Sequence, residues 1–184
     1  GMVIAGLAVG ATKGYIYLRS EYPLCKVVLN DAIKIAEAQN YLGNDILGSG
    51  SDFFLEVRIG AGSYVCGEET AMLESLEGKR GMVRAKPPLP AHVGLFGKPT
   101  VINNVLTLAS IPIIMAKGGD YYKDFGIGRS RGTIAFQLTG NIKRGGLVEK
   151  AFGITLGEMI EEYGQGTFSG QNVKAVQVGG PLGA

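Results

Sequence analysis

The residues with the most chemical potential lie in one short segment, 60–70, which reads GAGSYVCGEET. It places glycines on both sides of Tyr64 and ends in two adjacent carboxylates, Glu68 and Glu69. Glycines let a backbone approach a ligand closely. The carboxylates argue against a bare phosphate and suit ribose hydroxyls or a carboxamide, which donate hydrogen bonds. Tyr64 can stack on a planar ring. The segment therefore favours a ligand that has both a ring and hydrogen-bond donors.

A purely structural explanation of the same residues stays open. Carboxylates at the start of a helix are stabilised by the helix dipole, so Glu68 and Glu69 need no ligand to explain them. Tyr64 is equally compatible with ordinary packing of an aromatic ring beside glycines. Cys66 lies in the same turn, but no base is placed near it in the sequence to make it a nucleophile.

Several other classes of protein fit poorly. The single histidine, His92, has no neighbouring acid for a Ser-His-Asp hydrolase. Cys25 and Cys66 form no CxxC pair or metal-ligand cluster, so we expect no metal site in this chain and reduced thiols, as in a cytoplasmic protein. No Gly-Lys-Ser/Thr run follows the glycines, which disfavours a phosphate-loop enzyme. The net charge of +2 gives no reason to expect nucleic acid as a partner. Any catalysis would therefore rely on a bound cofactor.

The elements around this segment predict an α/β arrangement. Residues 14–19 and 53–59 read as strands, and helical spacing between them predicts a helix over 23–42 that Gly43 stops. This order is typical of a βαβ unit with parallel strands. The glycine turn follows the second strand directly and leads into a predicted helix over 68–76 that Gly78 ends. It should therefore lie at the carboxyl edge of the sheet, where open α/β sheets bind ligands.

The segments on either side of this unit carry weaker signals. Residues 2–11 predict a buried helix of small residues, too short to cross a bilayer and lacking the basic start of a signal peptide, so we expect no direct membrane insertion. Residues 78–100 predict a proline-rich loop that either presents cations to an anion or is simply solvated. A helix follows it, with Asn103 or Asn104 as its N-cap.

The composition changes near residues 118–131 and predicts a second, smaller α+β unit. Residues 132–140 and 146–152 read as a β-hairpin. A helix over 155–163 should begin at Thr155 with Glu158 completing a capping box. A last strand is predicted over 174–178, followed by a loop. These boundaries give two domains, 1–130 and 131–184.

Four runs of residues carry a resemblance to a known family. They are residues 60–71, 75–78, 86–91 and 97–105. With them the chain resembles the flavoprotein (51 kDa) subunit of NADH:quinone oxidoreductase, complex I, a module shared with NAD-dependent formate dehydrogenases and NAD-reducing hydrogenases. The resemblance implies a Rossmann-like FMN-binding domain followed by a β-grasp (soluble-ligand-binding, SLBB) domain. It also implies FMN and NAD(H) as cofactors, with single electrons passing to iron–sulfur clusters.

The resemblance also implies roles for individual residues. Tyr64, Gly67, Glu68 and Glu69 would line the FMN/NADH pocket, with Glu69 near the nicotinamide as the candidate catalytic residue. Lys86 would lie at the nucleotide end of the NADH cleft. Three residues would hold the flavin: Asn103, Asn104 and Thr107. The family often has phenylalanine where Leu89 stands, which weakens any stacking role there.

Departures from the family pattern set further expectations. The family's GRGG-type FMN loop and its Asp-Glu-Ser-Glu-Pro run would lie before Gly1, and the cysteines for a 4Fe–4S cluster would lie after Ala184. We therefore expect a middle piece of a longer subunit that binds FMN weakly or not at all by itself. Residues 141–149 and 177–184 look closer to the formate dehydrogenase β-subunit than to complex I.

The expected partners are iron–sulfur-containing subunits of a multi-subunit oxidoreductase in the cytoplasm, with any membrane association made through those subunits. The alternative is a non-catalytic module that binds a small ligand or docks a partner subunit.

Overall fold

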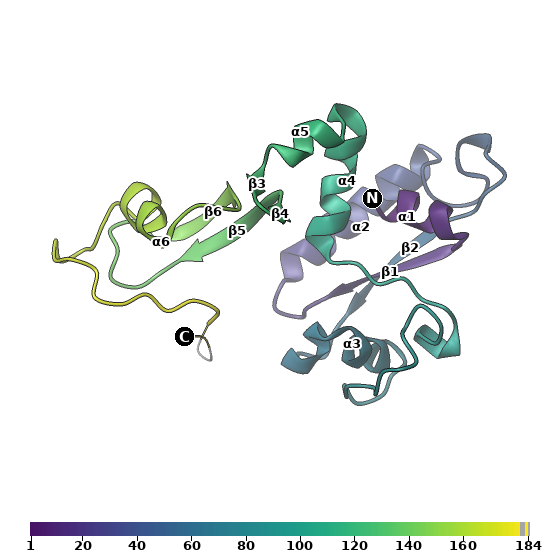
Figure 1. Ribbon diagram of the computed structural model, residues 1–184. Coiled ribbons are helices and arrows are strands. Elements are labelled where there is room, and N and C mark those ends of the chain that lie inside the picture. Colours follow the sequence, from purple (N-terminus) through teal and green to yellow (C-terminus); the bar gives the residue numbers. More distant parts are fainter. Residues whose placement is uncertain (181–182, 184) are drawn as a thin grey trace. The chain divides into compact units, whose positions relative to one another are not determined.

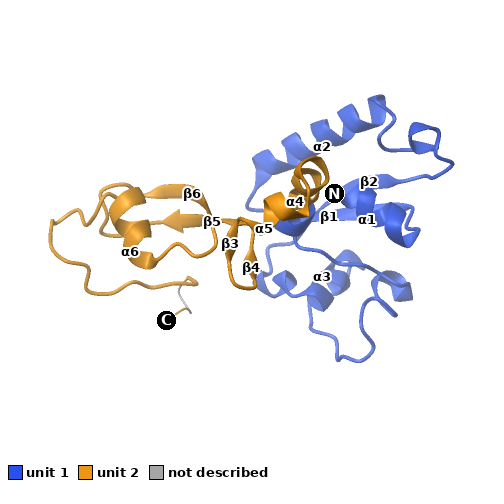
Figure 2. Ribbon diagram, turned by 45° about the horizontal axis from the view of Figure 1, so that its top comes forward, with its two compact units in different colours: residues 1–108 blue, residues 109–184 orange. Residues whose placement is uncertain are grey.

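The computed structural model describes residues 1–180 and 183, which form two compact units, 1–108 and 109–184 (Figure 2). Each unit contains both helices and strands, in agreement with the expected α/β class. The helix α4 (Val105–Lys117) continues from the first unit into the second along the chain. A functional domain boundary near residue 130 stays a prediction.

The first unit contains the predicted βαβ arrangement. Strand β1 (Lys13–Leu18) and strand β2 (Phe54–Ile59) run parallel, with the register Lys13 opposite Phe54 through Leu18 opposite Ile59. The helix α2 (Pro23–Ala38) connects them. In Figure 1 α1 and α2 lie along one side of the strand pair and α3 lies toward the other. The carboxyl ends of both strands therefore share one edge.

Helix α2 ends at Ala38, before the predicted stop at Gly43. Asn40 adopts the left-handed conformation at φ 59°. Its backbone N–H bonds to the Glu37 carbonyl, and the N–H of Tyr41 bonds to the Ala36 carbonyl. This is the Schellman arrangement, in which asparagine can replace glycine. The prediction was wrong about the end of the helix because it looked for glycine alone.

The apolar start of the chain forms helix α1 (Met2–Val9), but the predicted burial is wrong for most of it. Only Gly6 is buried. The Phe53 ring packs so close to it that a Cβ at this position would lie 2.2 Å from a ring atom. Ile4, Leu7 and Val9 remain 43–57% exposed. The helix is apolar on all sides, and one face is enough to pack on the small core centred on Phe53.

The glycine turn forms a short 3₁₀ segment (Tyr64–Gly67) that leads into helix α3 (Glu69–Leu76). The predicted stop is confirmed, since Gly78 adopts φ 79° and its N–H bonds to the Ser75 carbonyl. Residues 78–100 form the predicted loop, with one 3₁₀ turn at Leu95–Gly97. A further 3₁₀ turn lies at Ile46–Gly48.

Of the two asparagines proposed to cap α4, the structure selects Asn104. Its Oδ1 accepts a hydrogen bond of 2.8 Å from the N–H of Leu106. A side chain thus satisfies one backbone donor of the first turn, as an N-cap requires.

The second unit contains helix α5 (Gly119–Lys123), followed by the short antiparallel strands β3 (Gly126–Ile127) and β4 (Ser130–Arg131). The predicted hairpin follows, with β5 (Thr133–Leu138) paired to β6 (Gly146–Ala151). The helix α6 (Leu156–Glu158) continues as a π-helical turn (Met159–Tyr163). The capping box of Thr155 and Glu158 is confirmed.

The strand predicted over residues 174–178 is wrong, because this segment has irregular structure. A strand exists only where a neighbouring strand completes its hydrogen-bond ladder. In the described part of the chain the β5–β6 sheet has two strands, so the apolar alternation of 174–178 finds no pairing there.

Among the described residues, no helix is both long enough and apolar enough to cross a membrane.

Candidate functional site

A groove of about 890 Å³ opens at the carboxyl edge of β1 and β2. Arg19 comes just after β1 and Gly60 just after β2, so the ends of both strands supply its wall, as expected for a parallel sheet. The 3₁₀ turn, the first residues of α3 and the segment before α4 complete it. The lining residues besides Arg19 and Gly60 are Tyr17, Gly62, Ser63, Tyr64, Val65, Cys66, Gly67, Glu68, Glu69, Met72, Ile102, Asn103 and Asn104.

Most of the residues predicted for the site meet in this groove. Six of the eight line it: Tyr64, Gly67, Glu68, Glu69, Asn103 and Asn104. Lys86 is not a lining residue, yet its ammonium group contacts both Glu68 and Glu69. Thr107 stands apart, exposed in the first turn of α4 and outside the lining set.

The Glu68 carboxylate is the N-cap of α3. Its Oε2 accepts the N–H groups of Thr70 and Ala71, each at 2.9 Å, and the Thr70 hydroxyl at 2.5 Å. These bonds lower the pKa of Glu68 from 4.5 to about 2, and the bond from the Thr70 hydroxyl is the largest cause. The ammonium group of Lys86 also lowers this pKa. The structural explanation of Glu68 is thus supported, and the carboxylate is fixed as an anion beside the groove.

Glu69 is the more available of the two carboxylates. It is the first residue of α3, directly after the N-cap. Its side chain is 40% exposed, and its Oε1 forms an ion pair with Lys86. Lys86 Nζ also lies 3.2 Å from Glu68 Oε1. The two carboxylates raise the pKa of Lys86, Glu69 most strongly. One cation therefore offsets part of the charge of two adjacent anions at the rim.

Tyr64 and Gly67 form the open part of the wall. The Tyr64 side chain is 84% exposed. A Cβ at Gly67 would meet no atom within 4 Å, so this glycine leaves open space in the groove wall. An exposed ring beside an open glycine is a suitable surface for a planar ligand.

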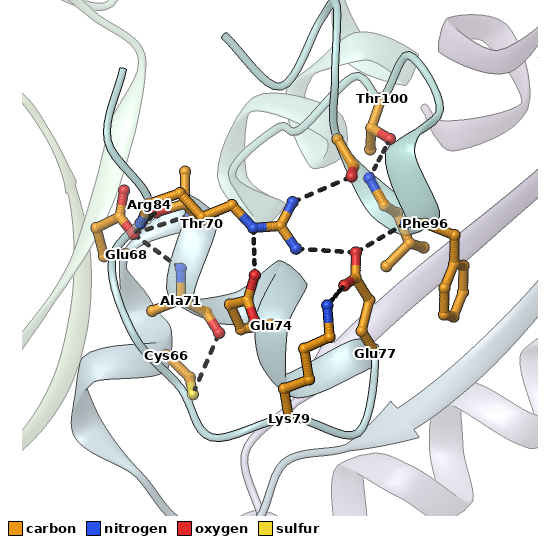
Figure 3. A network of polar contacts seen from close by, with 12 residues as sticks. Cys66, Glu68, Thr70, Ala71, Glu74, Glu77, Lys79, Arg84, Phe96 and Thr100 are labelled. Atoms are coloured by element: carbon orange, nitrogen blue, oxygen red, sulfur yellow. Dashed lines mark hydrogen bonds and ion pairs between the residues drawn. The ribbon is translucent and has the colours of Figure 1, made fainter. Parts of the chain in front are cut away.

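Behind the groove, Arg84 holds the loop of residues 78–100 against α3 (Figure 3). Its Nε donates to Glu74, its Nη2 donates to Glu77 at 2.8 Å, and its Nη1 donates to the Gly94 carbonyl at 3.1 Å. The Glu77 side chain is only 7% exposed and also accepts the Phe96 N–H. Lys79, followed by Arg84, lowers the pKa of Glu77 to about 2.

The sequence predicted cations in the loop of residues 78–100 but did not distinguish Arg84 from the other basic residues there. The spacing of Glu74, in the last turn of α3, and Glu77, its C-cap residue, was the available signal for an arginine that binds two carboxylates. Arg19 was also missed. It ends a predicted strand, and the rule that ligands bind at carboxyl edges applies to it as to Gly60.

The remaining candidate nucleophile and base have no supporting geometry in the described part of the chain. The Cys66 thiol is buried and donates to the Ala71 carbonyl at 3.8 Å. His92 lies in the loop and is not among the residues lining the groove. In residues 1–180 and 183, no three His, Cys, Asp or Glu side chains gather as a metal-binding group.

Comparison with known proteins gives a family match. The family model described as the Nuo51 FMN-binding domain matches residues 1–113. The chain is 49% identical over 99% of its length to HndC, a component of the NADP-reducing hydrogenase of Solidesulfovibrio fructosivorans. It is 47% identical over 96% of its length to a component of the NADH-quinone oxidoreductase of Aquifex aeolicus. It covers 37% and 41% of those proteins, so it spans about two fifths of the curated relatives it matches.

A solved structure extends the likeness to three dimensions. A crystal structure of NAD⁺-reducing NiFe hydrogenase in the H2-reduced state matches with a TM-score of 0.78 and 38% identity, over 91% of this chain and 28% of that chain. The strand edge, the glycine turn and the groove all lie within the residues that the family model matches. The chain therefore belongs to the family of Nuo51 FMN-binding domains.

Proposed function

We propose that the groove holds the ring and sugar portions of FMN and NAD(H), within a subunit that passes electrons between NAD(H) and iron–sulfur clusters. The observation that carries this proposal is the convergence of Tyr64, Gly67 and the Glu68–Glu69 pair on the carboxyl edge of a parallel strand pair. The family match and the oxidoreductase relatives support it.

The chemistry of the wall fits these ligands in a particular orientation. Carboxylates accept hydrogen bonds and repel phosphate, so Glu68 and Glu69 suit ribose or ribityl hydroxyls and a carboxamide N–H. Two cations adjoin the groove: Arg19 lines it, and Lys86 contacts the lining carboxylates. We infer that the ring ends of both ligands face α3 and that their phosphates face away from the Glu68–Glu69 pair.

Each residue of the wall then has a defined task. Tyr64 stacks on a ring, and Gly67 leaves room for it because it has no side chain. Glu69 orients the carboxamide that adjoins the reacting carbon. Asn104 uses its Oδ1 to cap α4 and therefore offers its Nδ2 to the flavin, beside Asn103. In this proposal Thr107 lies behind the residues that contact the ligand, because it does not line the groove. The bound flavin supplies the exchange between two-electron and one-electron steps.

A more specific assignment, to an NAD-dependent formate dehydrogenase with cytoplasmic iron–sulfur partner subunits, is also a proposal. Its support lies in residues 141–149 and 177–184, and residues 181, 182 and 184 of the second run lie outside the described part. The proposed SLBB-type β-grasp domain over 131–184 is supported by the β5–β6 hairpin and α6.

NMR titration of the 184-residue chain with FMN, and separately with NADH, tests the site. We expect weak binding, with shift changes in the amides of residues 60–69 and 102–104. Gly67→Ala should leave stability within about 0.5 kcal/mol, because the new methyl group meets open space, but it should reduce those changes by narrowing the groove. Millimolar NADH that leaves these amides unmoved, or a ligand that moves them equally in Gly67→Ala, would contradict the proposal.

A second candidate function, a non-catalytic ligand-binding or docking module, has one favourable observation. A hollow of about 430 Å³ lies in the second unit beside α6, with Lys143, Glu161 and Gln171 among its lining residues. If the titration moved only amides lining this hollow, this second function would be favoured over the first.

A further inference from the structure

Thr70 is the most completely buried polar residue near the groove, with 1% of its surface exposed. It does not line the groove, and it lies between Glu68 and the loop that carries Arg84 and Lys86 (Figure 3). A polar side chain this deeply buried is almost always hydrogen-bonded within the protein.

The Thr70 hydroxyl makes two bonds of opposite sense. It accepts the backbone N–H of Arg84 at 2.8 Å and donates its single proton to Glu68 Oε2 at 2.5 Å. A hydroxyl has one proton to give, so the Arg84 N–H on its acceptor side directs that proton toward Glu68. Glu68 then presents its other oxygen, Oε1, to Lys86.

Lys86 is connected to the same point through the backbone. It lies two residues after Arg84, whose N–H is tied to Thr70 and whose guanidinium is tied to Glu74, Glu77 and the Gly94 carbonyl. The start of the Lys86 side chain is therefore fixed relative to α3. Its ammonium group can span Glu68 and Glu69 only while this stretch of loop stays in place.

We propose that Thr70 is a positioning residue for the groove. Its hydroxyl joins the Arg84 loop to Glu68, and this link sets the orientation of the Glu68–Lys86–Glu69 cluster that faces the ligand. The inference rests on the proposed function for its consequence in binding, but the link itself is a property of the unliganded chain.

The role predicts a difference between two substitutions of one residue. Thr70→Ser keeps the hydroxyl and loses a methyl group, whereas Thr70→Val keeps the shape and loses the hydroxyl. In Thr70→Val the largest cause of the depressed pKa of Glu68 disappears, so its titration by carbon-13 NMR should move upward from about 2. Thr70→Ser should titrate like the parent chain.

Nucleotide binding gives the second measurement. The Kd for NADH should rise by about tenfold in Thr70→Val, because the cluster that faces the ligand loses its fixed orientation, and should stay within about twofold in Thr70→Ser. Lys79→Ala is the matched control, because Lys79 pairs with Glu77 of the same network and makes no contact with Thr70 among the described interactions. It should change neither measurement.

The outcomes separate the two proposals. If Glu68 titrates identically in Thr70→Val and Thr70→Ser, the positioning role is overturned, whatever NADH does. If Glu68 shifts only in Thr70→Val but the parent chain shows no NADH-dependent change at millimolar nucleotide, the link stands and the proposed function fails. Should Thr70→Val not fold, Thr70→Ala, which also lacks the hydroxyl, replaces it in the Glu68 titration, and Arg84→Lys tests the part played by the loop. Arg84→Lys keeps the backbone bond to Thr70, but a lysine cannot bind Glu74, Glu77 and the Gly94 carbonyl at once. If the loop positions Lys86, this variant must change the NMR signals of the Lys86 side chain.

Discussion

Residues 78–100 of the first unit and the β5–β6 hairpin of the second are held by different kinds of interaction. The loop has only one 3₁₀ turn, and side chains anchor it, with Arg84 bonded to Glu74, Glu77 and the Gly94 carbonyl. The hairpin has a six-pair backbone ladder, and its side-chain bonds, such as Thr133 to Glu149, are exposed. A loop without a ladder can follow the shape of a groove, but its position then depends on a few partly buried charges.

The largest expected effect is the loss of the Arg84 anchor. Arg84→Ala leaves the nearly buried Glu77 carboxylate without its guanidinium partner, which should lower the free energy of unfolding of the first unit by about 3 kcal/mol. Urea unfolding followed by amide exchange in α3 would measure it. Lys79→Ala should cost no more than about 1 kcal/mol, because the Lys79 side chain is 61% exposed and solvent screens its ion pair with Glu77. Equal losses in the two variants would mean that Arg84 does not anchor the loop.

The second effect concerns pH. The pKa of Glu77 is about 2 in the folded chain against an ordinary 4.5. The stability it contributes is therefore fully present above about pH 4.5 and is lost as the pH falls toward 2, because the unfolded state binds the proton first. Glu77→Gln should flatten the fall in unfolding free energy of the first unit across this range.

Urea unfolding at several pH values between 5.5 and 2.5 tests the pH effect. The exposed Glu37→Gln on α2 serves as the control and should keep the parental slope. A Glu77→Gln curve parallel to that of the parent chain would remove Glu77 as a source of acid sensitivity.

The smallest effect should appear in the second unit. Thr155→Ala removes the N-cap bond of 3.1 Å to the Glu158 N–H and half of the capping box, which should cost about 1 kcal/mol. Hydrogen exchange should accelerate in residues 156–163 and stay unchanged in α3. Thr155→Ser, which keeps the hydroxyl, should behave like the parent. A loss of protection in the β5–β6 ladder as large as that in α6 would show that the cap, more than the ladder, holds this unit.

Local signals in the sequence were enough for much of this fold. Alternation and helical spacing located β1, α2 and β2, and Gly78, the Asn103–Asn104 pair and the Thr155–Glu158 box identified element ends. These features depend on contacts a few residues apart, which neighbouring residue types determine. The same reasoning failed over residues 174–178, because a strand depends on a distant partner.

For the site, the sequence by itself pointed to six residues that line the groove, because the glycine turn, the Glu68–Glu69 pair and Asn103–Asn104 are recognisable as runs, but it did not point to Arg19. Only the tertiary structure decided how they are held. It assigned Glu68 to the helix cap, left Glu69 more exposed, and brought Lys86 across to both from seventeen and eighteen residues away. It also showed that Arg84 and Thr70 differ from the residues around them in sequence, because their burial and long-range hydrogen bonds depend on the packing of the loop against α3.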